Sequence, residues 1–309
     1  MQAMTRPLTR RSGLSRVLYE ARREWTAYLF LSPGLILFAV FTVFSVGFSF
    51  YLSFHQWNIL EPQKPFVGLQ NYRELLHDRY FLGAIVNTLY FAAVSVPVTM
   101  AIGLLVALML NTQIRFRGLF RTLYYLPGVT SLVVAAIIWK WVFSGDYGLL
   151  NYYLLKLHII DKPILWLSDR NLAMPAVITV SVWQGVGFHM VVYLAALQSI
   201  PQEIYDAAKV DGASAFRRLI YITVPLLRPT MFFQFVVAMI GSLQVFGQIL
   251  LMTGGGPIRR TTTVAFYLYQ KAFRDFEMGY AAAIAYCLFA MMIVFTIIYW
   301  RLAYREIEY

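Results

Sequence analysis

The chain has 309 residues, of which 60% are hydrophobic and only 13% are charged. Soluble domains of ordinary composition carry about 25% charged residues, so a water-exposed surface built from this chain would be unusually apolar. The composition therefore excludes an ordinary soluble domain and favours a protein whose apolar surface faces lipid. The net charge of +11 does not point to a nucleic acid, because the basic residues gather beside hydrophobic runs, where anionic lipid headgroups lie.

The N-terminal segment 1–27 carries six arginines and precedes a long apolar run at 28–54 that contains no Asp, Glu, Lys or Arg. A secretory signal has a shorter apolar region and a small-residue cleavage site. We therefore expect a basic cytoplasmic tail followed by a retained first membrane span.

Six stretches are apolar over the roughly 20 residues that a membrane helix needs. They are centred on 28–54, 83–110, 119–141, 172–197, 230–252 and 279–302. The third is the weakest, because Arg121 and Lys140 interrupt its flanks, although both side chains can reach lipid headgroups along their aliphatic stems. We predict an all-α membrane protein in which residues 28–304 form one domain of six transmembrane helices and residues 305–309 form a C-terminal tail.

The distribution of basic residues predicts the orientation of the spans. Lys and Arg number 15 in the two tails and the connections 111–121 and 200–229, against 11 in the other three connections. Cytoplasmic loops carry the excess of basic residues. Both termini and the segment 200–229 are therefore expected in the cytoplasm.

The spans hold few groups that could bind a driving ion or perform catalysis. No Asp or Glu lies at the centre of any span, whereas ion-coupled carriers usually hold an ionisable residue at depth. The chain also lacks a phosphate-binding loop and the common metalloprotease and serine-hydrolase motifs. An ion-coupled secondary carrier and a membrane enzyme are therefore disfavoured. We expect no catalytic residue, metal site or cofactor on this chain, and any ATP hydrolysis on a partner.

Segment 199–229 is predicted to form two short helices joined by a turn. Gly212 suits the left-handed residue that ends a helix, and Asp211 or Ser214 can cap the helix that follows. An ordinary helical hairpin joining two spans would show the same pattern. Only the spacing of particular residues can distinguish such a connection from a functional segment.

That spacing is specific. The residues that set it are, in order, Asp206-Ala207-Ala208, Gly212, Ile222 and Val224-Pro225. The pattern resembles the EAA–G–I–LP signature of binding-protein-dependent ABC importer permeases, with Asp in place of the signature Glu and Val in place of the signature Leu. Four further stretches are similar to the carbohydrate-uptake, MalF-like branch of that family: FVGLQNY at 66–72, NTL at 87–89, FRTLYYLP at 120–127 and LMTGGGP at 251–257.

The resemblance implies a type I ABC importer permease fold, in which the signature segment docks on an ATPase subunit. The residues that it assigns to this docking are Asp206, Ala207, Ala208, Asp211 and Gly212. It further implies a second, MalG-like permease, two ATPase subunits that bind ATP and Mg, and an extracytoplasmic binding protein that delivers the substrate. The expected location is the inner or plasma membrane of a prokaryotic cell.

A sugar or oligosaccharide is the expected substrate, bound near mid-membrane by aromatic faces and by amide and hydroxyl groups. The candidate residues in the fourth and fifth spans are Trp183, Gln184, Gly185, Phe188, Gly241, Ser242, Gln244 and Gln248. Packing between helices, with hydrogen bonds across them, would use the same residue types. Glycerol-3-phosphate or a glycerophosphodiester is the alternative substrate, although a phosphate favours an Arg or Lys partner and the centres of these two spans contain neither.

Overall fold

The computed structural model describes residues 25–112 and 115–303. The tail 305–309 and nearly all of the tail 1–27 that the sequence predicts lie outside the described residues. Every regular element within the described ranges is helical, and pairing of extended backbone is limited there to two isolated bridges, His55 with Phe66 and Asn58 with Glu277. The prediction of an all-α protein is confirmed for these residues.

The chain divides after Leu52 into two compact units, which are described separately. The first contains α2 (Trp25–Phe38), the π-helical η1 (Ala39–Phe44) and α3 (Ser45–Leu52), which follow one another without a break. Its mean hydropathy reaches 2.3 and none of its most apolar stretch is buried within the described structure. The predicted first span is therefore a helix long enough to cross a bilayer.

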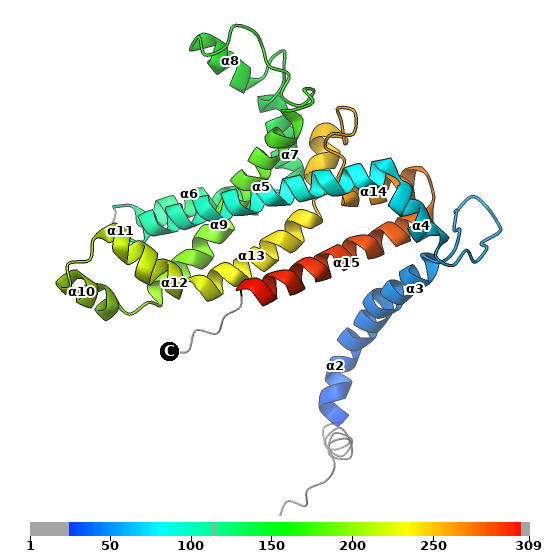
Figure 1. The fold of residues 1–309 in the computed structure, drawn as a ribbon, viewed down its shortest axis with the longest axis horizontal. Coiled ribbons are helices and arrows are strands. Elements are labelled where there is room, and N and C mark those ends of the chain that lie inside the picture. Colours follow the sequence, from blue (N-terminus) through cyan, green and yellow to red (C-terminus); the bar gives the residue numbers. More distant parts are fainter. Residues whose placement is uncertain (1–24, 113–114, 304–309) are drawn as a thin grey trace, which may run out of the picture. The chain divides into compact units, whose positions relative to one another are not determined.

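The second unit begins at Ser53 and is a bundle of long helices with short helices at its two ends (Figure 1). Its elements are α4 (Gln70–His77), α5 (Arg79–Leu110), α6 (Arg117–Val129), α7 (Leu132–Val142), α8 (Leu149–Lys156), α9 (Ala173–Gln198), α10 (Gln202–Val210), α11 (Ala215–Arg218), η2 (Leu219–Thr223), α12 (Val224–Leu226), α13 (Arg228–Leu243), η3 (Ile249–Thr253), α14 (Val264–Tyr269), η4 (Gln270–Arg274) and α15 (Met278–Ala303). Helix α9 packs along both α5 and α6, and α13 packs against α5.

Two of the predicted spans are broken in the structure. In place of one helix over 119–141, α6 and α7 meet at an angle of 95°, because Thr130 and Ser131 between them adopt extended backbone with ψ near 130°. The predicted span 230–252 is interrupted where α13 ends at Leu243, and a bend of 65° between the stretch Ala215–Leu226 and α13 lies before that span. By length and composition the described helices supply four membrane spans, or up to six when each bent pair counts as one.

A carboxylate joins three helices at the end of the bundle that carries α4 and α14 (Figure 1). Asp78 caps α5 by accepting a hydrogen bond from the Tyr80 backbone N–H at 2.8 Å. Its other carboxyl oxygen accepts from the hydroxyls of Tyr267, at 2.6 Å, and Tyr280, at 2.8 Å. Partial burial alone raises the pKa of Asp78, but these hydrogen bonds outweigh burial and hold the pKa below its usual range.

The same end is fixed by residues of the sequence motif at 87–89. The Asn87 amide donates to the carbonyl oxygens of Arg259 and Thr262 at 3.0 and 2.9 Å. The Thr88 hydroxyl oxygen accepts from the Val264 backbone N–H at 2.9 Å. These bonds satisfy the backbone of the connection before α14, which has irregular structure close to a membrane helix and therefore needs internal partners.

We expect Asp78→Ala to lower the free energy of unfolding by about 2 kcal/mol, because it removes a helix cap and two hydrogen bonds to a charged group that is partly screened by solvent. Asp78→Asn keeps a capping oxygen and should lower the free energy of unfolding by a smaller amount. Thermal unfolding of the purified protein in lipid nanodiscs measures both. The exposed Asp146→Ala is the matched control, and an Asp78→Ala midpoint equal to that of the control would contradict the assignment.

The same carboxylate gives a pH dependence. Because the folded-state pKa of Asp78 is depressed, its stabilisation is fully present above the ordinary aspartate pKa of about 3.9 and is lost as the pH falls through the folded-state value. The difference in unfolding midpoint between the wild type and Asp78→Asn should therefore be constant at neutral pH and shrink below about pH 4.

Candidate functional site

The segment with the signature spacing forms an exposed helix–turn–helix at one end of the second unit, where α10 and α11 lie beyond the ends of α9 and α6 (Figure 1). No residue of α10 or α11 is buried. Of the five predicted docking residues, Asp206, Ala207 and Ala208 lie on α10, and Asp211 and Gly212 form the turn that follows it.

The turn has the geometry that its sequence predicts. Gly212 has φ of +74°, a left-handed conformation that a residue with a Cβ adopts only at a cost. The backbone N–H of Ala213 donates to the Ala208 carbonyl at 2.9 Å, which closes α10. Ser214 then caps α11, its hydroxyl accepting from the Arg217 backbone N–H at 3.3 Å. Of the two capping residues considered from the sequence, Ser214 has this role.

Asp206 is ionised and exposed. Its carboxylate accepts hydrogen bonds from Lys209 at 2.7 Å and from Gln202 at 3.2 Å. These two bonds, that of Lys209 first, lower the pKa of Asp206. Because both partners are exposed, the ion pair with Lys209 contributes little to stability. The carboxylate therefore remains available to a partner.

Large apolar side chains extend this exposed surface beyond the signature residues. Val210, Phe216 and Tyr221 are 88%, 69% and 76% exposed. Sequence reasoning did not single them out, although an aromatic or branched side chain in a short polar helical segment is a signal that could have found them. Tyr205 connects α10 to η2, because its hydroxyl lies 3.0 Å from the hydroxyl of buried Thr223 on η2.

A cavity of about 690 Å³ opens among α5, α7, α9, α13 and the segment that follows α13. Five of the eight residues that the sequence assigns to substrate line it: Gly185, Gly241, Ser242, Gln244 and Gln248. The Ser242 hydroxyl donates to the Met239 carbonyl of its own helix at 2.9 Å. Helix α13 ends at Leu243, so Gln244 and Gln248 lie where the span is interrupted rather than within the continuous helix that the sequence predicted.

The other three candidates do not line this cavity. Trp183 lines a separate, apolar groove of about 590 Å³, where its ring meets Trp139 edge-on with centroids 5.6 Å apart. The Gln184 amide donates to the Thr130 carbonyl at 3.5 Å, beside the break between α6 and α7. Phe188 is 43% exposed. The four-residue spacing of Gln184 and Phe188 therefore does not bring them to the cavity.

A buried polar pair beside the cavity was left out of the sequence-based set. His189 lines the cavity, and its Nδ1 lies within hydrogen-bonding distance of the side-chain oxygen of fully buried Gln234. His189 is thus the hydrogen-bonded packing residue that its isolated position in the fourth span indicates. The pair ties α9 to α13 at the wall of the cavity.

Residues 99–306 match the family model described as Binding-protein-dependent transport system inner membrane component. The match covers more than half of the chain, so the chain belongs to this family of transport permeases. The family resemblance that the signature at 206–225 indicates is confirmed.

Relatives and solved structures agree with the family. The lactose transport system permease protein LacF of Rhizobium radiobacter is 36% identical over 93% of this chain and 95% of its own length. The sn-glycerol-3-phosphate transport system permease protein UgpA of Yersinia pestis is 32% identical over 93% of this chain and 96% of its own length. A chain from the crystal structure of a bacterial alginate ABC transporter, in complex with an alginate pentasaccharide-bound periplasmic protein, matches with a TM-score of 0.79 and 25% identity over 93% of this chain and 96% of that chain. The fold of an ABC importer permease is therefore confirmed.

Alanine substitution at two glycines of this region should have opposite effects on the thermal midpoint of unfolding. A Cβ on Gly187 would lie 2.4 Å from the Tyr124 carbonyl oxygen, so the methyl group would force α9 away from α6. A Cβ on Gly241 meets nothing within 4 Å, and alanine there gains up to about 1 kcal/mol of helix propensity. We expect Gly187→Ala to lower the thermal midpoint, at a cost of about 1–3 kcal/mol, and Gly241→Ala to leave or raise it. Equal midpoints would contradict the close packing at Gly187.

Proposed function

We propose that this chain is the transmembrane permease subunit of an ATP-binding-cassette importer that carries a sugar or oligosaccharide delivered by an extracytoplasmic binding protein. The observation that carries the proposal is the exposed α10–α11 segment, whose signature residues surround a left-handed turn at Gly212. The family and the relatives LacF and UgpA support the transport class.

The signature residues Asp206, Ala207, Ala208, Asp211 and Gly212 act as the contact with an ATPase subunit. The alanines leave room for close approach, Asp206 offers an ionised carboxylate, and the exposed apolar side chains around Val210 offer area that a partner can bury. ATP and Mg are bound and ATP is hydrolysed on two partner ATPase subunits, so this chain is not itself an enzyme.

The full assembly contains a second, MalG-like permease. The chain crosses the plasma or inner membrane of a prokaryotic cell six times, with both termini and α10–α11 in the cytoplasm. Two observations support this orientation: the excess of basic residues on that side, and the presence of the last turn of α5, the first turn of α6 and α10–α11 at the same end of the bundle (Figure 1).

The substrate passes through the cavity lined by Gly185, Gly241, Ser242, Gln244 and Gln248. Its apolar walls with a few amides and hydroxyls are typical of a site for small polar molecules. The likeness to UgpA favours sn-glycerol-3-phosphate as the second candidate substrate. An anionic phosphate is best held by Arg or Lys, and the described residues that line the cavity include neither, so a neutral sugar is the better fit.

Uptake into proteoliposomes tests the function. The chain is reconstituted with its second permease, ATPase subunits and binding protein, and labelled sugars are supplied outside. ATP-driven import should continue when ionophores collapse the ion gradients and should stop when ATP is depleted. Uptake that follows the ion gradient and ignores ATP would instead identify a secondary carrier.

Replacing Gly212 should uncouple transport without preventing insertion. Gly212→Val places a β-branched residue at φ of +74°, which costs about 1–2 kcal/mol and shifts the turn. We expect sugar-stimulated ATP hydrolysis and uptake to fall about tenfold or more, which corresponds to a coupling loss of ~1.4 kcal/mol.

Gly212→Asn is the matched control, because asparagine tolerates the left-handed conformation and has open space around its Cβ. It should retain most of the coupling. Normal uptake by a well-inserted Gly212→Val variant would contradict a role for this backbone geometry in coupling. An equal loss of uptake in both variants would contradict it as well.

The amides of Gln244 and Gln248 are expected to bind substrate. The double variant Gln244→Ala/Gln248→Ala should lower uptake about tenfold, because each lost hydrogen bond is worth roughly 1 kcal/mol, while ATP hydrolysis without substrate stays unchanged. Gln184→Ala provides the comparison from the same candidate set, since its amide lies outside the cavity lining, and it should have a smaller effect. Unchanged uptake in the double variant would refute this site.

A further inference from the structure

A second cavity, of about 420 Å³, lies at the end of the bundle opposite α10–α11. Its walls come from the connection 53–69, α4, η4 and the first turn of α15, all within the second unit. Its volume falls within the roughly 300–1,000 Å³ that small-molecule sites occupy. With α10–α11 in the cytoplasm, this cavity opens on the outer side of the membrane.

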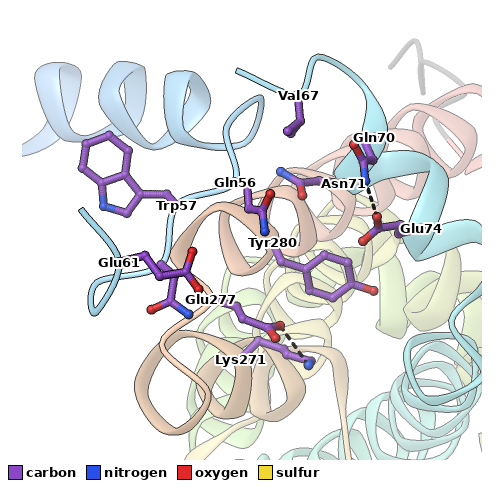
Figure 2. A pocket seen from close by; sticks show the side chains of 11 residues that line it. Gln56, Trp57, Glu61, Val67, Gln70, Asn71, Glu74, Lys271, Glu277 and Tyr280 are labelled. Atoms are coloured by element: carbon purple, nitrogen blue, oxygen red, sulfur yellow. Dashed lines mark hydrogen bonds and ion pairs between the residues drawn. The ribbon is translucent and has the colours of Figure 1, made fainter. Parts of the chain in front are cut away.

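The lining is almost entirely hydrogen-bonding groups. The walls of the cavity that Gln244 and Gln248 line, which we call the mid-membrane cavity after its proposed depth, are by contrast mostly apolar. Figure 2 shows side chains from three elements gathered around the Tyr280 ring, among them Gln56, Glu61, Glu74 and Glu277. Amides both donate and accept hydrogen bonds, and carboxylates accept. A ring of these groups beside an aromatic face matches a saccharide, whose hydroxyls need donors and acceptors and whose carbon skeleton packs on aromatic rings.

The walls are held in place before any ligand arrives. The Asn71 amide donates to the carbonyls of Ser53 and His55 at 2.8 and 3.1 Å, so α4 fixes the start of the connection. The Gly279 backbone N–H donates to the Trp57 carbonyl at 3.1 Å, which joins the same connection to α15. Such preorganisation lowers the cost of binding.

The lining side chains differ in whether they already form a hydrogen bond or an ion pair. Glu74 accepts from Gln70 at 2.8 Å, and Glu277 pairs with Lys271 at 2.9 Å (Figure 2). By contrast, the side chains of Gln56 and Glu61 line the cavity with no hydrogen bond to another residue in the described part of the chain. They are the groups that a ligand can engage without breaking an existing contact.

The charge of the lining selects among ligands. Three carboxylates, Glu61, Glu74 and Glu277, face one cation, Lys271. Burial alone lowers the pKa of Lys271, but hydrogen bonds to Glu277 and Asp275 outweigh it and raise the pKa, so the cation stays charged. The excess of negative charge repels a phosphate or a uronate and accommodates a neutral molecule.

We propose that this outer cavity is a binding site for a neutral saccharide, distinct from the mid-membrane cavity, in which Gln56 and Glu61 make the hydrogen bonds that the ligand gains. The proposal rests on the proposed function, because it places a second contact for the imported sugar at the outer entrance. It also restricts the substrate class to uncharged sugars.

Saturation-transfer NMR on the full chain in lipid nanodiscs tests this site. The probes are lactose, maltose and trehalose as neutral saccharides and sn-glycerol-3-phosphate as the anion. A Gln244→Ala/Gln248→Ala background weakens the mid-membrane contribution. In that background a neutral saccharide should give a transfer signal that falls about fivefold or more when Gln56→Ala/Glu61→Ala is added, as expected for lost hydrogen bonds.

Gln63→Ala is the matched control, since Gln63 is an exposed amide on the same connection that does not line the cavity, and it should leave the signal unchanged. The phosphate should give little signal until Glu61→Lys changes the lining from three carboxylates and one cation to two of each, which removes its excess of negative charge. No saccharide signal, an equal signal in the pocket variant, or a phosphate signal as strong as that of the sugars would each overturn the proposal.

Binding to the isolated chain needs no ATPase, so its failure is separable from failure of the importer. ATP-driven uptake by the wild-type assembly together with saccharide binding that ignores Gln56 and Glu61 would overturn the outer site alone. Absence of ATP-driven uptake of any sugar would overturn the proposed function, and the outer site would fall with it as a contact for imported sugar.

Discussion

The close packing of α9 against α5 and α6 is the constraint on which the rest of the second unit depends. At Gly187 the two backbones of α9 and α6 approach so closely that a single methyl group would clash with the Tyr124 carbonyl. Small residues allow this approach in membrane bundles, where packing rather than water drives association. Helix α9 also supplies Gly185 and His189 to the cavity and leads directly into α10. One helix therefore connects the wall of this cavity to the exposed helix–turn–helix.

Interrupted helices build the cavity that Gln244 and Gln248 line. The bend between α6 and α7 and the end of α13 at Leu243 both lie beside it. Non-helical backbone at membrane depth is tolerated where it is buried in protein or lines a polar space, and transporters place binding sites at such breaks. The His189–Gln234 pair joins α9 to α13 at this wall through a hydrogen bond between the imidazole and the side-chain oxygen of the buried amide.

The two ends of the bundle differ in hydrogen bonding and in exposure. At the end that carries α4 and α14, Asp78, Asn71 and Asn87 each hydrogen-bond to two or more partners from other segments of the chain, which gives a rigid polar framework. At the other end α10 and α11 are unburied, and they expose both charged and apolar side chains.

The sequence by itself determined the class of the protein, four of its long spans and the helix–turn–helix with Gly212, because apolar length, helix caps and left-handed glycines are local properties. It also identified five residues that line the cavity. Only the tertiary structure decided that Trp183, Gln184 and Phe188 lie elsewhere, that α6 and α7 meet at 95°, and that a polar cavity lies among the connection 53–69, α4 and the start of α15. These features depend on the contacts between segments far apart in the chain, such as Asn58 with Glu277, which no local pattern contains.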